Sequence, residues 1–248
     1  MIDVDSVTID YGKGEKTVRA VEDISFHLDK GDSLALIGPS GCGKTSLLFA
    51  LCGLLKPRIG KITVSGEEVR SPRREVALIL QNAGLLPWKT VWQNANLSLL
   101  INGDFPSQNA AAVLAHLGLD NVMSRFPAEL SEGMKRRVGI ARALSTSPAV
   151  LLMDEPLASL DTLTREKIQD LFLRLWHENG FSMILVTHNI EEAAFLGSKI
   201  IVLTDRPARI SKIVSNPEMG SIEYRGTPAF HEVMSQLREA LELSLIHI

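Results

Sequence analysis

Short apolar segments rich in β-branched residues alternate along this chain with longer segments whose apolar residues recur every three or four positions. That alternation predicts βαβ units, in which a parallel sheet is covered by helices. The predicted core strands are residues 34–37, 76–80, 150–153, 183–187 and 199–203. Residues 3–10, 18–21 and 24–28 lie between glycine turns and predict an antiparallel region at one edge. We therefore predict an α/β fold with a mixed sheet.

The same pattern predicts one domain over residues 1–248 with two distinct parts. Residues 85–145 show helical spacing and almost no strand pattern, which predicts a helical subdomain. Residues 211–248 are interpreted as a C-terminal extension, rich in Ser, Gly and Pro up to residue 227 and helical from Pro228. Its last six residues, LSLIHI, match one reading frame of a common sequencing-transposon end, so we hypothesise that they are not native.

Composition narrows the classes of function. The formal net charge is −3, which gives no broad attraction to nucleic acid. No apolar run approaches the roughly 20 residues that a membrane helix needs, so any membrane association is expected to go through a partner. Cys42 and Cys52 have no zinc-like spacing and are interpreted as free thiols of a reducing cytosol.

A phosphate-binding loop follows the strand predicted at residues 34–37. The sequence GPSGCGKT matches G-x-x-x-x-G-K-[ST] at Gly38, Gly43, Lys44 and Thr45, and a helical stretch comes directly after it. A glycine turn with a surface lysine is the simpler alternative, but it does not account for the strand before and the helix after. The pattern predicts a P-loop NTPase core that binds ATP and Mg²⁺. The expected nucleotide contacts are Gly38, Pro39, Ser40, Gly41, Cys42, Gly43, Lys44, Thr45 and Ser46.

Two adjacent carboxylates end the strand predicted at residues 150–153. Asp154 and Glu155 would lie at the carboxyl edge of a parallel sheet, where open α/β sheets bind ligands. Asp154 is expected to help hold Mg²⁺ together with Thr45 of the loop, and Glu155 to polarise the attacking water. Alone, such a pair could also be an ordinary turn. The phosphate-binding loop upstream favours the catalytic interpretation.

The segment LSEGMKRRVGIARAL at residues 130–144 resembles the signature motif of ATP-binding cassette (ABC) ATPases, usually LSGGQ or LSGGM. The order of the other motifs is similar too. The resemblance implies a Q-loop glutamine that senses Mg²⁺ or water, a D-loop at residues 159–161, a switch histidine and an adenine-stacking aromatic residue. These functions fall on Gln81, Asp161, His188 and Tyr11, with Val18 beside the nucleotide.

The resemblance also implies a dimer, either a homodimer or a pair with a related cassette. In the family, each ATP lies between the P-loop of one subunit and the signature of the other, which here is Ser131, Glu132 and Gly133. Ser131 is expected to cap a helix whose free N–H groups face the γ-phosphate. Glu132 departs from the usual glycine and places a carboxylate near that phosphate, so we expect a weakened but active site. A degenerate half-site with weak turnover is the alternative.

The segment NAGLLPWKTVWQNA at residues 82–95 resembles cassettes of nitrate, sulfonate and taurine importers. That resemblance implies permease subunits in the membrane, an external substrate-binding protein, a peripheral position on the cytoplasmic face, and no nucleic acid. The expected docking surface consists of Leu85, Leu86, Pro87, Trp88 and Trp92, unless these residues simply fill a core. The rival functions are a soluble cassette of translation or DNA repair and a regulatory ATP-binding module.

Overall fold

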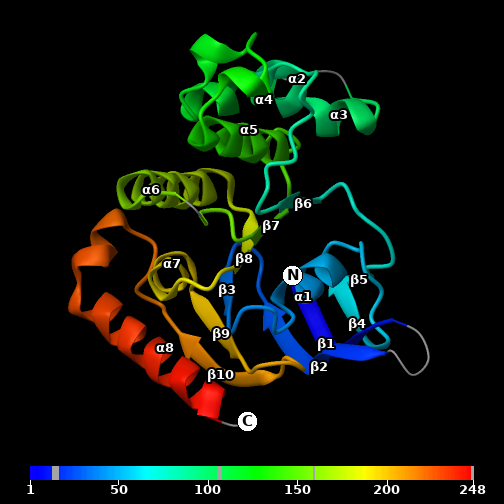
Figure 1. Ribbon diagram of the computed structural model, residues 1–248, viewed down its shortest axis with the longest axis vertical. Helices are drawn as coiled ribbons and strands as arrows, with labels where there is room; N and C mark the ends of the chain where they lie inside the picture. The colour runs from blue at the N-terminus through cyan, green and yellow to red at the C-terminus, as the bar shows by residue number, and fades with distance from the viewer. Residues whose placement is uncertain (13–16, 105–107, 159, 247–248) are drawn as a thin grey trace.

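The computed structural model describes residues 1–12, 17–104, 108–158 and 160–246. A group of helices lies at the top of Figure 1, above two β-sheets with further helices packed against them. This arrangement is the mixed α/β architecture that the hydrophobic pattern predicts.

The larger sheet has the strand order β10-β9-β3-β8-β7-β6. Neighbouring strands from β9 through β6 pair in parallel, whereas β10 pairs antiparallel with β9, so the sheet is mixed. The predicted core strands agree with the observed ones to within one or two residues. The strand bounds are β3 Ser33–Ile37, β6 Val76–Ile79, β7 Val150–Asp154, β8 Ser182–Val186, β9 Lys199–Leu203 and β10 Ile210–Ser215.

The smaller sheet is antiparallel, in the order β2-β1-β4-β5. It confirms the antiparallel region predicted from the N-terminal pattern. Its bounds are β1 Ile2–Tyr11, β2 Val18–Leu28, β4 Ile59–Val64 and β5 Glu67–Glu68. The hydrophobic pattern did not identify β4, because its first three residues are exposed and carry no alternation. Gly60 lets β4 approach β1 closely, since a Cβ there would lie 2.3 Å from the Asp5 carbonyl oxygen.

The larger sheet divides the hydrophobic core into two layers. In β3, Leu34 and Leu36 point into one layer and Ala35 and Ile37 into the other. The first layer lies between the larger sheet, α1 (Lys44–Leu51) and the smaller sheet. The second lies against the helical group and against α6 (Thr162–Asn179), α7 (Ile190–Leu196) and α8 (Pro228–Ile246). Both faces of the parallel strands are therefore covered, which accounts for their continuous apolar sequences.

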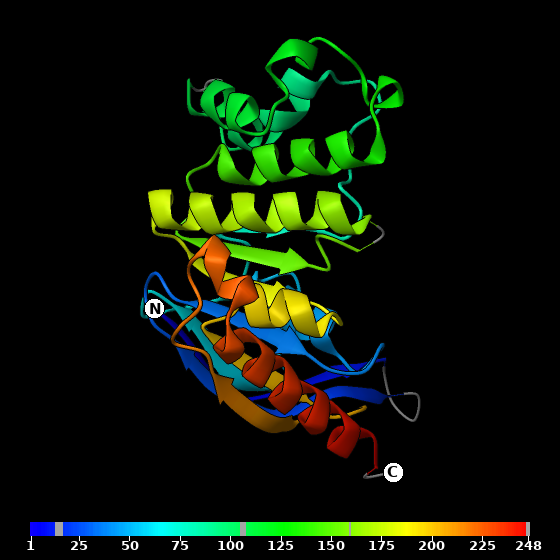
Figure 2. The same cartoon turned by 90° about the vertical axis from the view of Figure 1, so that its left-hand side faces the viewer.

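The helices of the upper group are α2 Val91–Ala95, α3 Leu97–Ile101, α4 Gln108–His116 and α5 Glu132–Leu144, with short 3-10 turns at Asp120–Val122 and Pro127–Glu129. Below them lie α6 Thr162–Asn179 and α7 Ile190–Leu196, and α8 Pro228–Ile246 follows the 3-10 turn Ile222–Gly226. Figure 2 shows α8 running along α7 and the β9–β10 side of the sheet. Within the described part of the chain, none of the helices has the length and apolar character to span a bilayer.

The C-terminal segment was interpreted as a Ser-, Gly- and Pro-rich stretch followed by a helix. The helix is present from Pro228, but residues 210–215 form β10, an edge strand of the larger sheet. The strand was missed because only Val214 of its six residues is buried, which leaves almost no alternation to detect.

Glu192, on the first turn of α7, is a buried carboxylic acid with a relative exposure of only 3%. Its Oε2 accepts a hydrogen bond from the Thr187 hydroxyl, and its Oε1 has no hydrogen-bond partner among the described residues. Burial raises the pKa of Glu192 to about 7, although Thr187, Arg165 and His188 oppose the shift. A carboxyl group in this environment is held neutral more easily than it is ionised.

We expect Glu192→Gln to flatten the dependence of stability on pH. The folded chain binds the Glu192 proton more tightly than the unfolded chain does, so stability is lost as pH rises from about 4.5 to about 7. The wild-type chain should lose roughly 2 to 3 kcal/mol more unfolding free energy than the variant over that range. Urea denaturation at pH 5 and pH 8 measures the difference, with Glu239→Gln, an exposed acid on α8, as control. Equal pH slopes in wild type and Glu192→Gln would contradict the assignment.

Candidate active site

The loop between β3 and α1 has a backbone that requires glycine. Gly41 and Gly43 adopt positive φ angles of 75° and 136°, and a Cβ at Gly43 would lie 2.4 Å from the Ala20 carbonyl oxygen. Gly43 caps α1 without a side-chain hydrogen bond, so the first N–H groups of that helix remain available to an anion. All nine residues predicted to contact phosphate, from Gly38 to Ser46, lie in this turn and the start of α1.

The Lys44 side chain is folded back into the loop. Its Nζ donates hydrogen bonds to the carbonyl oxygens of Gly38 and Pro39, both at 2.8 Å, and its relative exposure is 5%. Both acceptors are neutral carbonyl dipoles rather than carboxylates. A phosphate group entering the loop would replace these carbonyls as the stronger, charge-assisted acceptor.

Thr45 and Asp154 lie together at the base of the loop. The Thr45 hydroxyl donates to Asp154 Oδ1 at 3.1 Å. Burial raises the pKa of the Asp154 carboxyl, and neighbouring Glu155 adds to the rise, whereas Thr45 and Lys44 lower it. A dication bound here would favour the carboxylate, and hydroxyl and carboxylate oxygens are ligands suited to Mg²⁺. The donor set therefore fits the predicted Mg²⁺ site.

Glu155, His188 and Gln81 lie close together in space, although 107 sequence positions separate Gln81 from His188. Glu155 Oε1 lies 3.2 Å from His188 Nδ1, and Glu155 Oε2 lies 3.5 Å from Gln81 Nε2. These three side chains line one cavity of about 280 Å³, together with Arg165, Thr187, Asn189 and Glu192. Glu155 has a positive φ of 45°, a conformation that costs on the order of 1 kcal/mol and is found most often at functional sites.

Tyr11 and Val18 face each other across the β1–β2 pair at the rim of the phosphate loop. The Tyr11 hydroxyl donates to Ser46 Oγ at 3.1 Å, which ties the end of β1 to α1. Both side chains are exposed, as a surface for adenine or ribose must be. The structure thus brings the predicted base-binding residues to the loop that is predicted to bind the phosphates.

The signature residues begin α5, and the structure confirms Ser131 as its N-cap, with its hydroxyl accepting from the Met134 N–H at 3.3 Å. Glu132 forms an ion pair: its Oε1 lies 2.6 Å from Lys135 Nζ, and its side chain is 80% exposed. An acid in the first turn also favours the helix dipole. The presence of Glu132 in the signature, which favoured a degenerate half-site, is therefore also explained by its ion pair with Lys135 and its place in the first turn of α5.

Asp161 caps α6, and its Oδ1 accepts from the Thr164 N–H at 3.0 Å. This hydrogen bond to the Thr164 backbone holds the pKa of Asp161 below its usual value. Leu160 and Asp161 belong to the predicted D-loop, whereas Ser159 lies outside the described residues. Neither the signature residues nor Asp161 is among the residues found to line the cavity of Glu155 and His188.

Three charged residues at or near this cavity were not predicted. Arg136 on α5 donates to the Pro156 carbonyl at 2.6 Å, next to Glu155, and Arg165 on α6 donates to the Leu160 carbonyl at 2.9 Å. Glu192 is the third. The only sequence signal for it is the N-x-x-E spacing from Asn189, which is a helix N-cap pattern and gives no hint of a catalytic cavity.

Comparison with known proteins agrees with this geometry. The family described as ABC transporter matches residues 21–158, more than half of the chain. The taurine import ATP-binding protein TauB of Jannaschia sp. (strain CCS1) is 40% identical over 89% of this chain and 86% of its own length. The aliphatic sulfonates import ATP-binding protein SsuB of Bacillus cereus (strain ATCC 10987 / NRS 248) is 34% identical over 97% of this chain and 96% of its own length.

Solved structures give the same result. An ATP-binding cassette solved as a dimer in a post-hydrolysis state, bound to ADP and Pi, is 28% identical, with a TM-score of 0.78. The match covers 87% of this chain and 98% of that one. The family match over more than half of the chain and these relatives, together with the P-loop, the strand-end acids and the capped helix, show that this chain belongs to the ABC transporter family as an ATP-binding cassette.

Proposed function

We propose that this chain is the ATP-hydrolysing subunit of an importer for a small solute, such as taurine, another sulfonate or nitrate. The observation that carries the proposal is the Glu155–His188–Gln81 cluster, which lines one cavity at the carboxyl edge of the sheet that also carries the phosphate loop. The similarity to taurine and sulfonate import ATP-binding proteins over most of the chain supports the choice of solute class.

In the proposed reaction, Lys44 exchanges its two carbonyl partners for the outer phosphates of ATP. Mg²⁺, held through Thr45 and Asp154, would neutralise phosphate charge when bound. Glu155 orients a water molecule and accepts its proton while the water oxygen bonds to the γ-phosphorus and the bond to the ADP oxygen breaks. His188 stabilises the phosphoryl group from beside Glu155, and Gln81 steadies the same carboxylate.

The complete site is proposed to form between two subunits. Within the described chain, the residues that begin α5 are not among those that line the hydrolysis cavity, and an anion could approach the Ser131-capped helix end from a second subunit. A second cassette, identical or related, would bring its own α5 end to the γ-phosphate bound here. The dimeric state of a similar cassette bound to ADP and Pi supports this arrangement. Turnover would then depend on association of the subunits, which lets ATP act as a mechanical bridge.

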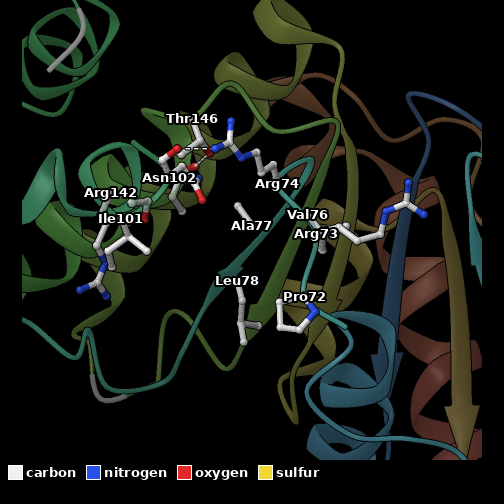
Figure 3. Close-up of a pocket in the computed structure, with 12 residues that line it drawn as sticks. Pro72, Arg73, Arg74, Val76, Ala77, Leu78, Ile101, Asn102, Arg142 and Thr146 are labelled. Carbon is white, nitrogen blue, oxygen red and sulfur yellow. Dashed lines mark hydrogen bonds between the residues drawn. The ribbon is translucent and has the colours of Figure 1, made fainter. Parts of the chain in front are cut away.

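The permease is proposed to dock between the two parts of the cassette, on the cytoplasmic face of the membrane. Trp88 is 70% exposed, whereas Leu85 and Trp92 pack against the core, so the predicted aromatic surface is reduced to Trp88 and its immediate neighbours. A cavity of about 290 Å³ lies between the edge strand β6 and helices α3 and α5, with Arg73, Arg74 and Arg142 around it (Figure 3). Arg142 also donates to the Gly84 carbonyl at 2.9 Å, which links this cavity to the loop before Trp88.

Glu155→Gln should retain ATP binding and lower the ATPase turnover at least about 100-fold, because the amide keeps the shape of the side chain but cannot accept the proton. It should also trap an ATP-bridged dimer. Turnover and light-scattering mass with Mg²⁺ and ATP are measured together, with Glu239→Gln as the control for charge removal. Wild-type turnover in Glu155→Gln would sink the catalytic assignment, and a monomer throughout would sink the shared site.

Trp88→Ala should leave ATP binding by the isolated subunit unchanged and weaken its association with the permease subunits, by about tenfold or more for a central aromatic contact. Trp92→Ala is the matched comparison. Because Trp92 packs against the core, its loss should lower the unfolding temperature of the subunit instead. Unchanged permease affinity in Trp88→Ala, or unfolding of that variant, would count against the docking surface.

A further inference from the structure

The turn that carries His188 is closed by a ring of hydrogen bonds in which Glu192 takes part twice. The Thr187 hydroxyl donates to Glu192 Oε2 and accepts the Asn189 N–H at 3.0 Å. The Asn189 side chain in turn accepts the Glu192 N–H at 3.2 Å. His188 lies between Thr187 and Asn189 in the sequence, and its side chain is exposed. The ring therefore limits where the imidazole can point by fixing the backbone on either side of it.

The second oxygen of Glu192 has no partner of its own. Oε1 is buried and makes no hydrogen bond to any described residue, although the carboxyl lines the same cavity as Glu155 and His188. An unpaired buried acceptor is costly, and about 280 Å³ of polar space is enough for a side chain or water to reach it. Glu192 Oε1 can therefore accept a hydrogen bond from a donor that reaches it through the cavity.

Arg165 is the group best placed to be that partner. It lines the cavity from the first turn of α6 and uses one nitrogen, Nη2, to hold the Leu160 carbonyl, just before Asp161. The charged and titratable groups that face Glu192 are Arg165 on α6, His188 on the turn, Glu155 at the end of β7 and Arg136 on α5. Of the two arginines, Arg165 lines the cavity together with Glu192, whereas Arg136 is not among the lining residues and donates to the Pro156 carbonyl.

We propose that Glu192 is a positioning residue for His188: it closes the Thr187–Asn189 turn and, in the ATP-loaded site, pairs through its free oxygen with Arg165. The pair would link the loop at Leu160 and Asp161 to the switch histidine. Docking of a second subunit against that loop would then change the position of His188. This inference rests on the proposed ATP hydrolysis, and neither Glu192 nor Arg165 touches the reacting atoms in it.

The test is steady-state ATPase kinetics of the full chain with Mg²⁺ and ATP. Glu192→Ala should lower kcat about tenfold or more with little change in KM, whereas Glu192→Gln should lose less, since its amide oxygen still accepts the Thr187 hydroxyl. In a His188→Ala background, Glu192→Ala should cause no further loss, because residues that act through one another are not additive. Independent, multiplicative losses would overturn the proposal and assign Glu192 a merely structural role.

A second measurement covers the case in which Glu192→Ala does not fold. Pairing with Arg165 requires the ionised carboxyl, so the ratio of wild-type kcat to Glu192→Gln kcat should rise from pH 6 to pH 8. The same ratio measured in an Arg165→Ala background should be independent of pH. A flat ratio with Arg165 present would overturn the pairing. Absence of wild-type ATPase activity would instead refute the proposed function, so the two failures are distinguishable.

Discussion

Backbone hydrogen bonds at the ends of three parallel strands tie the catalytic turns to one another. The Glu155 N–H donates to the Val186 carbonyl at 2.9 Å, and the Thr187 N–H donates to the Leu36 carbonyl at 3.1 Å. The phosphate loop after β3, the acids after β7 and the switch turn after β8 therefore share one edge of the sheet. Their side chains can meet only because the strands are parallel and in this register, which brings chemistry to the carboxyl edge.

The site concentrates buried charge that the fold alone would not favour. Lys44 is surrounded by carbonyls, Asp154 and Glu192 have raised pKa values because they are buried, and Glu155 adopts a left-handed backbone conformation. Burial of an ionisable group and a left-handed backbone conformation each cost stability. In the proposed reaction, phosphate, a dication and Arg165 would interact favourably with these groups, so ligand binding would offset part of that cost.

The structure also changes the meaning of the unusual signature residue. A carboxylate beside a γ-phosphate is unfavourable if it points inward, but Glu132 pairs with Lys135 on the exposed side of α5. Surface pairs of this kind contribute little to stability, so the main effect of the pair is to hold the Glu132 side chain toward Lys135 and to neutralise its negative charge. Ser131 still caps α5, and a Cβ at Gly133 would make only an ordinary contact with Thr164 Cγ2 at 3.9 Å. An active two-subunit site is consistent with both facts.

The features of this protein that depend only on neighbouring residues could be predicted from the sequence. The apolar strands, the glycine-dependent phosphate loop and the Ser131 cap each depend on residues within a few positions, so their pattern can be read directly. The pairing of β4 and β10 depends on tertiary structure, because strands with mostly exposed residues carry little alternation. It alone separated exposed Trp88 from packed Trp92. It also buried Glu192 beside Thr187 and Arg165, since burial and the partners of a charged side chain are set by segments far away in the sequence.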